Sequence, residues 1–413
     1  MIRKGLGVGR APINFGIFKN READWVFKRT LAYMSEKAAE TGECLHVARK
    51  INERDAESWI NEWAELAAKV EKQAEESLRS GCKVSAKESF LRASNYYRTA
   101  EYGCVPSHPR FHELWEKSVA CFHKACPLFD PPVQIVEVPF KGKKLPGYFW
   151  HPDDTKAKRP TLMAVGGYDS SGEEIFFGTG MATIRRGYNY FTFEYPGHRG
   201  AVHLYPDCVK RPDYEVPFKA AIDYLETLPG VDERIALVGF SFGGYVVSRV
   251  AVYEDRLQAV IPDGPIVDVY QVQTAALRPF LKWMPASFAN ALLERRLHRA
   301  PLVNSLVKYG LWSAGYPDLP LLDWYKLPLA RQFTIRDDLN KITCPALSLV
   351  GEGEGEELIR QAREFYEGIS SEDKRLHIFT LEQDGSNDHV QLDNLSRAQQ
   401  VAFDWLDEVF SYR

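Results

Sequence analysis

Residues 234–245 read RIALVGFSFGGY and decide the fold. An apolar run leads into GFSFG at residues 239–243, which matches the GxSxG pattern, and a helical stretch follows. In this pattern a serine stands on a tight strand-to-helix turn, and the glycines two positions away on either side let neighbouring chains pass closely. The turn exposes the hydroxyl group at the carboxyl end of a sheet and brings the next amide to a helix N-terminus, where it stabilises negative charge. We therefore predict Ser241 as a nucleophile and the amide of Phe242 as an oxyanion donor.

The segments on both sides of this motif alternate between short apolar runs and helical patterns. The expected strands lie at residues 133–140, 145–150, 160–167, 188–197, 234–241, 259–265, 344–355 and 374–382. The expected helices lie near residues 176–186, 217–227, 243–253, 357–367 and 397–409. Strands that alternate with helices form a mostly parallel sheet with helices on both faces. The predicted fold class is therefore α/β, with Ser241 at the end of the fifth strand.

Residues 1–130 read as helical instead. Apolar residues recur at helical spacing from 55 to 80, and a further helix is expected over 109–125. Between these two stretches, Ser85 stands three residues before Glu88, which predicts a capping box at the start of a helix. We expect a separate N-terminal helical domain over this part of the chain.

A stretch rich in Leu, Trp, Tyr and Pro, residues 269–338, interrupts the alternation of strands and helices. Because it lies between two expected strands, we predict an inserted lid here, with the α/β core on either side at 131–268 and 339–413. Its aromatic residues are candidates for an apolar roof over an aromatic substrate, although packing of the lid on the sheet is the simpler explanation for most of them. These aromatic residues are Phe280, Trp283, Trp312, Trp324 and Tyr325.

A serine nucleophile on this kind of turn needs a histidine base on the loop after the last strand. Three histidines follow Ser241 in the chain. His298 lies in the expected lid, His377 lies inside an apolar run, and His389 lies in the polar loop DGSNDHVQLDN at residues 384–394. Only His389 has the expected position, so we predict it as the general base.

The acid that orients this histidine should follow the penultimate strand, in LSLVGEGEGEE at residues 347–357. The usual spacing, three residues after the glycine that ends the strand, selects Glu354, and Glu352 is the close alternative. Asp263 and Asp268, which follow the preceding strand, remain further candidates. A glutamate can replace the commoner aspartate because the acid only orients and electrostatically supports the imidazole.

The loop after the third strand reads AVGGYDSSGEE at residues 164–174. Gly166 and Gly167 end an apolar strand and permit a backbone bend that turns an amide toward the serine. We predict the amide of Tyr168 as the second oxyanion donor, beside that of Phe242.

Composition excludes several other classes of function. Lys and Arg number 52 and Asp and Glu number 56, which gives a net charge of −4 and no basic surplus for nucleic-acid binding. No stretch approaches the roughly 20 apolar residues of a membrane span, and the first residues lack the apolar core of a signal peptide. The seven cysteines are scattered without a CxxC pair, so we expect reduced thiols and a cytoplasmic protein.

No cofactor or metal is expected. The chain has no GxGxxG after a first strand and no phosphate-binding P-loop. Cys121, His123 and Cys126 are close in sequence but would point to different faces of a helix, so they do not have the spacing of a zinc site.

Together with the N-terminal helices, several motifs resemble the 2,6-dihydroxypseudooxynicotine hydrolase family and its FrsA-like esterase relatives, which include polyketide-shortening hydrolases. The motifs that carry this resemblance are SAKESFLRASNYYRTAEY (85–102), GGYDSSGEE (166–174), EYPGHRG (194–200), GFSFGGY (239–245) and DHVQLDNLSRAQQVAFDWLDEVF (388–410). The resemblance implies an α/β-hydrolase core, a helical N-terminal domain that covers the site, and often a homodimer. It puts Ser241 and His389 on the family's nucleophile and base, and Glu354 on its usual aspartate.

We therefore expect a serine hydrolase that acts on a small carbonyl or ester substrate. Several members of the family cleave a carbon–carbon bond next to a ketone in aryl ketones or polyketides, which makes this the first expectation. A carboxylesterase, thioesterase or acyltransferase with the same serine is the alternative. A non-catalytic binding protein on a hydrolase scaffold is the second alternative, and the presence of Ser241 and His389 argues against it.

Overall fold

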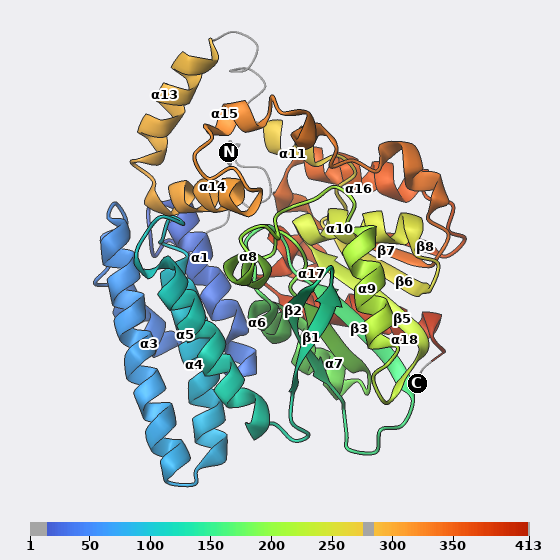
Figure 1. The fold of residues 1–413 in the computed structure, drawn as a ribbon, viewed down its shortest axis with the longest axis horizontal. Helices are drawn as coiled ribbons and strands as arrows, with labels where there is room; N and C mark the ends of the chain where they lie inside the picture. Colours follow the sequence, from blue (N-terminus) through green and yellow to red (C-terminus); the bar gives the residue numbers. More distant parts are fainter. Residues whose placement is uncertain (1–14, 276–284, 412–413) are drawn as a thin grey trace. The chain divides into compact units, whose positions relative to one another are not determined.

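The computed structural model describes residues 15–275 and 285–411, and within them the chain divides into two compact units (Figure 1). The sheet unit contains Val136–Ala286 and Pro320–Arg413, and the helical unit contains Asn14–Ile135 and Ser287–Leu319. The lid that the sequence predicted at 269–338 is therefore shared between the two units, because its middle part, from Ser287 to Leu319, clusters with the N-terminal helices.

The helical unit is built mainly from α-helices. They are α1 (Arg21–Ala32), α2 (Thr41–Ala48), α3 (Ala56–Arg79), α4 (Lys83–Glu101), α5 (Arg110–Ala125), α13 (Ala286–Leu297) and α14 (Pro301–Ser313), with short 3₁₀ turns η1 (Tyr33–Glu36) and η2 (Cys126–Leu128). Figure 1 shows α3, α4 and α5 side by side. Aromatic rings fill the space between them: Trp63 of α3 packs against Tyr96 of α4 with ring centres 5.7 Å apart.

The start of α4 differs from the prediction. The helix begins at Lys83 with Cys82 in the N-cap position, and no side chain caps it. Ser85 lies inside the first turn of the helix, so the predicted capping box with Glu88 is wrong. Sequence patterns place helix ends less well than helix interiors, because a residue or two of extra helix costs little free energy.

Within the described residues, the sheet unit holds an eight-stranded sheet in the order β1-β2-β4-β3-β5-β6-β7-β8. The strands are β1 (Gln134–Phe140), β2 (Lys143–Trp150), β3 (Arg159–Val165), β4 (Asn189–Phe193), β5 (Val231–Phe240), β6 (Leu257–Asp263), β7 (Ala346–Gly351) and β8 (Lys374–Phe379). The pairs from β4 to β8 are parallel, and β2 pairs antiparallel with β4. This is the α/β fold class that the alternation predicted.

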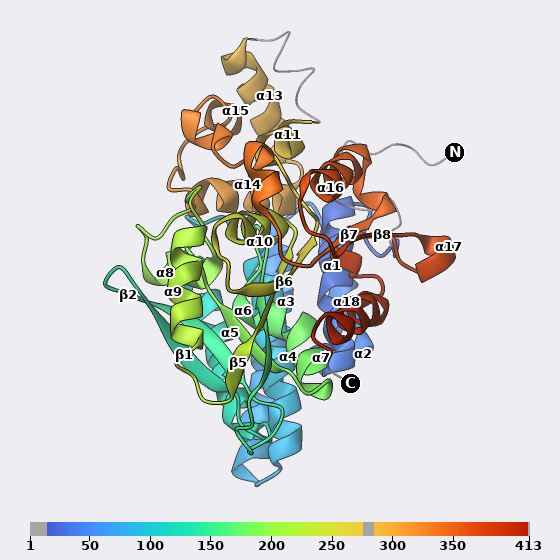
Figure 2. The ribbon, with the colours of Figure 1, turned by 90° about the vertical axis from the view of Figure 1, so that its right-hand side faces the viewer.

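Helices follow most of these strands. They are α6 (Gly172–Ile175), α7 (Met181–Arg185), α8 (Arg199–Leu204), α9 (Glu215–Leu225), α10 (Phe242–Tyr253), α11 (Val269–Thr274), α15 (Leu321–Trp324), α16 (Glu356–Gly368), α17 (Leu381–Asp384) and α18 (Leu395–Val409). A π-helical turn, η3 (Phe176–Gly180), joins α6 to α7, and 3₁₀ turns occur at η4 (Pro328–Arg331), η5 (Arg336–Lys341), η6 (Glu352–Glu354) and η7 (His389–Gln391). Figure 2 shows α16 beside β7 and β8.

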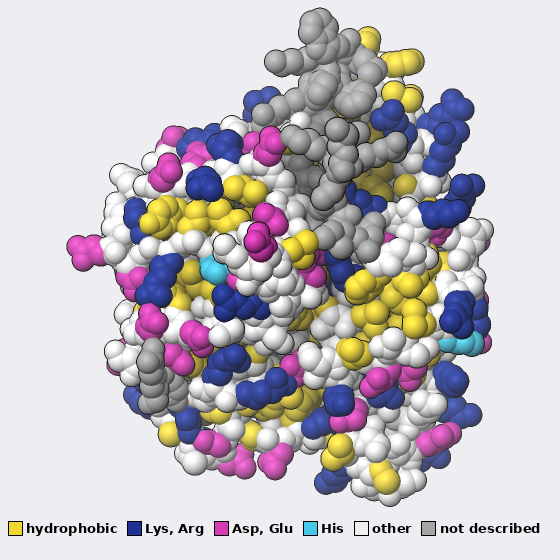
Figure 3. Space-filling view, turned by 180° about the vertical axis from the view of Figure 1, so that it is seen from behind, with side chains coloured by type: hydrophobic (Ala, Val, Ile, Leu, Met, Phe, Trp, Pro, Cys, Tyr) yellow, Lys and Arg dark blue, Asp and Glu magenta, His cyan; other side chains and the backbone are white. Residues whose placement is uncertain are grey.

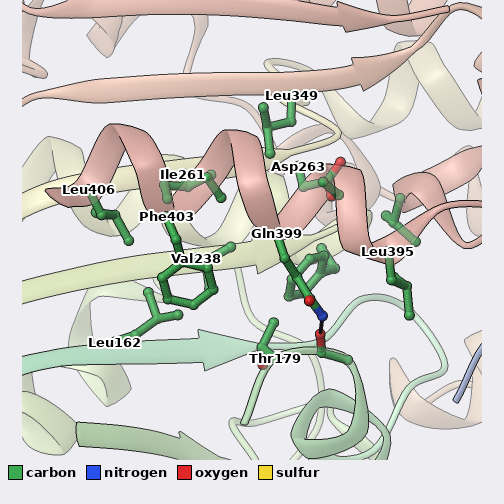
Figure 4. Close-up of a pocket in the computed structure, with 15 residues that line it drawn as sticks. Leu162, Thr179, Val238, Ile261, Asp263, Leu349, Leu395, Gln399, Phe403 and Leu406 are labelled. Atoms are coloured by element: carbon green, nitrogen blue, oxygen red, sulfur yellow. Dashed lines mark hydrogen bonds between the residues drawn. The ribbon is translucent and has the colours of Figure 1, made fainter. Parts of the chain in front are cut away.

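The two faces of the sheet are covered by different helices. Figure 4 shows α18 lying over the strands, with Leu406 and Phe403 directed toward Val238 of β5 and Ile261 of β6 around a small apolar pocket. The next residue of β5, Gly239, abuts α10 on the opposite face. Because side chains alternate along a strand, β5 is buried on both sides, and this explains its continuous apolar run.

The surface carries charges of both signs. In Figure 3 the Lys and Arg side chains are interspersed with Asp and Glu over the visible face. This mixture agrees with the small net charge of −4.

Candidate active site

Ser241 stands on a strained turn between β5 and α10. Its backbone has φ 60° and ψ −120°, a conformation that residues with a side chain rarely adopt. The turn is held because the amide of Ser241 donates to the carbonyl oxygen of Asp263 at 2.7 Å. Helix α10 begins at Phe242, the next residue. The hydroxyl group is therefore presented where β5 ends and the helix starts.

The glycines of the GxSxG motif are required by close backbone contacts. A Cβ atom on Gly239 would lie 2.2 Å from the carbonyl oxygen of Gly243. A Cβ atom on Gly243 would lie 2.5 Å from the carbonyl oxygen of Gly166, in the loop after β3. Any larger residue at either position would push the turn away from its neighbours, as the motif predicted.

The structure brings Ser241, His389 and Glu354 together in a hydrogen-bonded series. Nε2 of His389 lies 2.9 Å from Oγ of Ser241, although 148 residues separate the two in the chain. Nδ1 of His389 lies 2.5 Å from Oε2 of Glu354. The Glu354 side chain is fully buried, and its other oxygen accepts from the amide of Gly351 at 2.8 Å.

These three residues meet because each follows a parallel strand. Ser241 follows β5, Glu354 lies in the 3₁₀ turn η6 after β7, and His389 lies in η7, beyond β8. The carboxyl ends of parallel strands lie at one edge of a sheet, and sites in α/β proteins form there. The loops also touch directly, since the amide of Gly353 donates to the carbonyl oxygen of Asn387 at 2.9 Å.

The other predicted acids lie elsewhere or have another role. Glu352 is exposed, and its Oε1 accepts from the amide of Leu381 at 3.4 Å. Asp268 caps the N-terminus of α11 and forms an ion pair with Arg336 at 3.2 Å. The carboxylate on Nδ1 of His389 is that of Glu354, not that of Glu352 or Asp268.

Asp263 is a second buried carboxyl group near the hydrogen-bonded series of Ser241, His389 and Glu354. Burial, with the negative charge of Glu354 as a further cause, raises the pKa of Asp263 well above its ordinary value. Nε2 of Gln391 donates to its Oδ1 at 3.3 Å. The raised pKa means that Asp263 holds a proton under conditions in which an exposed aspartate is ionised.

The predicted oxyanion loop, which we define as residues 166–169, lies against the nucleophile. A Cβ atom on Gly167 would lie 2.8 Å from Cβ of Ser241 and 3.3 Å from the amide nitrogen of Phe242. Phe242 is the first residue of α10, so its amide has no acceptor within the helix. The two loops that carry the amides of Tyr168 and Phe242 are thus in direct contact.

Lys210 is a neighbour of this region that the sequence did not reveal. Its Nζ lies 3.8 Å from the ring centre of Tyr168 and 5.6 Å from that of Phe242, so the amine contacts the aromatic faces of both predicted oxyanion residues. Lys210 is 7% exposed, and Nζ makes no hydrogen bond within the described part of the chain. Burial lowers the pKa of Lys210 to about 7, against a smaller opposing effect of Asp169. No motif marks this lysine in the sequence.

The remaining histidines and lid aromatics have other surroundings. His377, on β8, pairs with Asp384 at 3.1 Å, and His298 is exposed after α13. Trp312 packs on Phe111 within the helical unit, with ring centres 5.1 Å apart. Trp324 and Tyr325 are buried in the sheet unit, and Phe280 and Trp283 lie outside the described residues.

Comparison with known proteins decides the family. The profile described as "Esterase FrsA-like" matches residues 29–316, which is more than half of the chain. The chain belongs to the FrsA-like esterase family. The matched segment of this FrsA-like protein contains Ser241 and the oxyanion loop, whereas Glu354 and His389 follow it. Together with the fold, the family makes the chain a hydrolase of the α/β-hydrolase class.

Relatives of this FrsA-like protein are also hydrolases by name. It is 29% identical to "Hydrolase LUC6" of Fusarium sp over 96% of this chain and 98% of the relative. It is 28% identical to "20-hydroxy-prefusarin hydrolase FUS2" of Gibberella moniliformis, again over 96% of this chain and 98% of the relative. It is 35% identical to "Hydrolase acrC" of Aspergillus aculeatus over 66% of each chain.

Solved structures share the fold of this FrsA-like protein. The crystal structure of 2,6-dihydroxy-pseudo-oxynicotine hydrolase superimposes with a TM-score of 0.70 at 23% identity, over 92% of this chain and 95% of that one. The protein AbyA5 superimposes with a TM-score of 0.64 at 15% identity, over 94% of each chain. Among the described helices, none has the length and apolar character that crossing a membrane requires.

Proposed function

We propose that this FrsA-like protein is a serine hydrolase that cleaves a carbon–carbon bond next to a ketone in an aryl ketone or polyketide-type substrate. Ser241 is the nucleophile, His389 the general base and Glu354 the acid that orients it. The observation that supports a serine nucleophile is the 2.9 Å contact between Oγ of Ser241 and Nε2 of His389.

In the first step, Oγ of Ser241 attacks the carbonyl carbon while its proton passes to Nε2 of His389. Nδ1 of His389 keeps its proton and donates it in the hydrogen bond to Glu354, whose carboxylate stabilises the imidazolium. The negative charge that forms on the carbonyl oxygen is held by the amides of Tyr168 and Phe242.

In the second step, the tetrahedral intermediate collapses and the bond between the carbonyl carbon and its neighbour breaks. The departing carbon leaves with the electron pair as a carbanion or enolate and takes the proton from His389. Water then attacks the acyl-enzyme with His389 as base, which releases a carboxylic acid and restores Ser241. A carbon leaving group is feasible only when a second carbonyl, or the keto tautomer of an aromatic hydroxyl, accepts its negative charge as an enolate, so the proposal requires an activated ketone.

One relative is named for the small molecule that it hydrolyses. FUS2, which aligns with the chain over nearly its whole length, is named as the hydrolase of 20-hydroxy-prefusarin. Ester cleavage is the second candidate, because the matching family is described as an esterase family and the same serine chemistry breaks a carbon–oxygen bond.

A fluorophosphonate probe tests the nucleophile. The wild-type protein should become labelled, and labelling should disappear in Ser241→Ala and slow strongly in His389→Ala. A folded wild-type protein that remains unlabelled would favour a non-catalytic binding protein on the same scaffold.

A substrate panel separates the two kinds of hydrolysis. We expect turnover of β-diketones, naphthopyrones or phenols acylated on a ring carbon, with loss of activity in Ser241→Ala. Rapid turnover of p-nitrophenyl esters with no cleavage of any ketone would contradict the carbon–carbon assignment and leave the esterase.

A further inference from the structure

A second series of serine, histidine and glutamate lies behind the oxyanion loop. Nε2 of His198 lies 3.3 Å from Oγ of Ser170, and Nδ1 of His198 is hydrogen-bonded to Oε2 of Glu194. All three side chains are buried, with 7%, 1% and 3% of Ser170, His198 and Glu194 exposed. Glu194 and His198 belong to the motif EYPGHRG, and Ser170 belongs to the motif GGYDSSGEE. The proposed mechanism uses none of these three side chains.

The direction of each hydrogen bond follows from the donors around Glu194. The amides of Gly172 and Gly200 donate to its two carboxylate oxygens at 2.7 and 3.2 Å. Burial opposes ionisation of Glu194, but His198 and these two amides outweigh it and lower the pKa of the carboxyl group. Because an ionised carboxylate only accepts, Nδ1 of His198 is the donor in its contact with Glu194.

Ser170 connects this histidine to the oxyanion loop. The amide of Gly167 donates to Oγ of Ser170 at 2.7 Å. Oγ of Ser170 also lies within hydrogen-bond distance of Nε2 of His198, so the serine joins the amide of Gly167 to the imidazole. Gly166 must be a glycine for this packing, since a Cβ atom there would lie 1.9 Å from Oγ of Ser170.

The same motif holds the loop at two further points. The hydroxyl group of Tyr195 donates to the carbonyl oxygen of Gly166 at 2.8 Å. The guanidinium of Arg199 donates to the carbonyl oxygen of Asp169 at 2.9 Å. The Gly166–Gly167 and Asp169–Ser170 peptide groups, one on each side of Tyr168, are therefore both tied to the segment that follows β4.

We propose that Ser170, His198 and Glu194 are positioning residues that hold the oxyanion loop so that the amide of Tyr168 points at the reacting carbonyl oxygen. The proposal rests on the proposed function of Ser241. The second series does not react with substrate: Oγ of Ser170 is already engaged by the amide of Gly167 and by His198. It acts by fixing the backbone beside Ser241, where a displacement of about 1 Å is enough to slow catalysis about 100-fold.

The test compares Ser170→Ala with the control Ser248→Ala. Ser248 is also fully buried, but its hydroxyl donates to the carbonyl oxygen of Gly244 within its own helix. We expect Ser170→Ala to lower kcat for p-nitrophenyl butyrate by about 10- to 100-fold with KM nearly unchanged. The inhibition constant of an aryl trifluoromethyl ketone, which forms a tetrahedral adduct with a serine, should rise in parallel. Ser248→Ala should change neither quantity.

Two further variants keep the inference falsifiable if the first one folds poorly. Ser170→Thr keeps the hydroxyl group and should retain most of kcat, whereas Glu194→Gln should behave like Ser170→Ala. If folded Ser170→Ala keeps wild-type kcat and inhibitor affinity, or if the control loses as much, the inference is wrong. A wild-type protein that no fluorophosphonate labels at Ser241 would instead refute the proposed function.

Discussion

Nδ1 of His389 lies 2.5 Å from Oε2 of Glu354, whereas Glu352, two residues earlier in the same loop, is exposed at the surface. The two glutamates alternate with glycines, and in the sequence only the usual spacing after Gly351 favours Glu354 over Glu352. Their difference arises at the end of β7, where the amide of Gly351 donates to Oε1 of Glu354 and holds its side chain inward.

This pair yields the first prediction. In Glu354→Gln the amide cannot stabilise the imidazolium, and its NH₂ group favours the wrong tautomer of His389, so kcat should fall by about 10²- to 10⁴-fold. Glu352→Gln removes the same charge from the same loop and should keep activity within about twofold of wild type. Steady-state kinetics with one ester substrate gives kcat for both variants. Equal losses in the two variants would contradict the assignment of Glu354.

Asp263 yields a prediction on stability. Its raised pKa means that the folded protein holds a proton at pH values where the unfolded chain, with a carboxyl pKa of about 3.9, has lost it. The contribution of Asp263 to the free energy of unfolding therefore falls as the pH rises from about 4 to the folded-state pKa. Asn at this position cannot ionise. Urea unfolding at about pH 5 and about pH 8 should show wild type losing stability relative to Asp263→Asn at the higher pH. If the free energy of unfolding of wild type instead rose relative to that of Asp263→Asn between about pH 5 and about pH 8, this prediction would be wrong.

For Lys210 we predict the opposite pH dependence of stability from that of Asp263. Its pKa is lowered to about 7 in the folded protein, whereas the unfolded chain keeps the ordinary value of 10.5. Between these values the unfolded state binds more protons, so stability rises with pH, by about 1.4 kcal/mol per pH unit at most. Lys210→Met has no proton to exchange. The free energy of unfolding of wild type should therefore increase relative to Lys210→Met between about pH 7.5 and about pH 9.5. A constant difference would show that Nζ is solvated rather than buried.

The variant Gly167→Ala tests the contact between the oxyanion loop and the nucleophile. A Cβ atom there would lie 2.7 Å from the carbonyl oxygen of Phe240 and 2.8 Å from Cβ of Ser241, so Gly167→Ala must displace one of the two segments. We expect kcat to fall by about 100-fold, as for the loss of one oxyanion donor. Gly42→Ala is the matched control, because a Cβ atom on Gly42 would have no neighbour within 4 Å. Circular dichroism checks whether both variants are folded, and an unchanged kcat in folded Gly167→Ala would contradict the predicted oxyanion loop.

Much of the sheet unit could be predicted from the sequence. The apolar run before Ser241 coincides with β5, and the expected helix at 243–253 coincides with α10, Phe242–Tyr253. Such elements are long, and burial on both faces leaves an unmistakable apolar pattern. Short elements were harder to predict: the single helix expected at 176–186 is instead the π-helical turn η3 followed by α7, and the short helix α6 precedes them. Sequence periodicity averages over a turn of helix and does not register a local change in winding.

The sequence by itself determined the fold class and the position of Ser241, since both follow from local rules: apolar periodicity and the glycines that a strained strand-to-helix turn requires. It also narrowed the base to His389 by chain order. Only the tertiary structure decided which glutamate faces His389, that Lys210 lies against Tyr168 and Phe242, and that Ser170, His198 and Glu194 form a second series. These relationships join loops far apart in the chain. Their side-chain directions depend on how the ends of several strands pack together, and no local pattern records that packing.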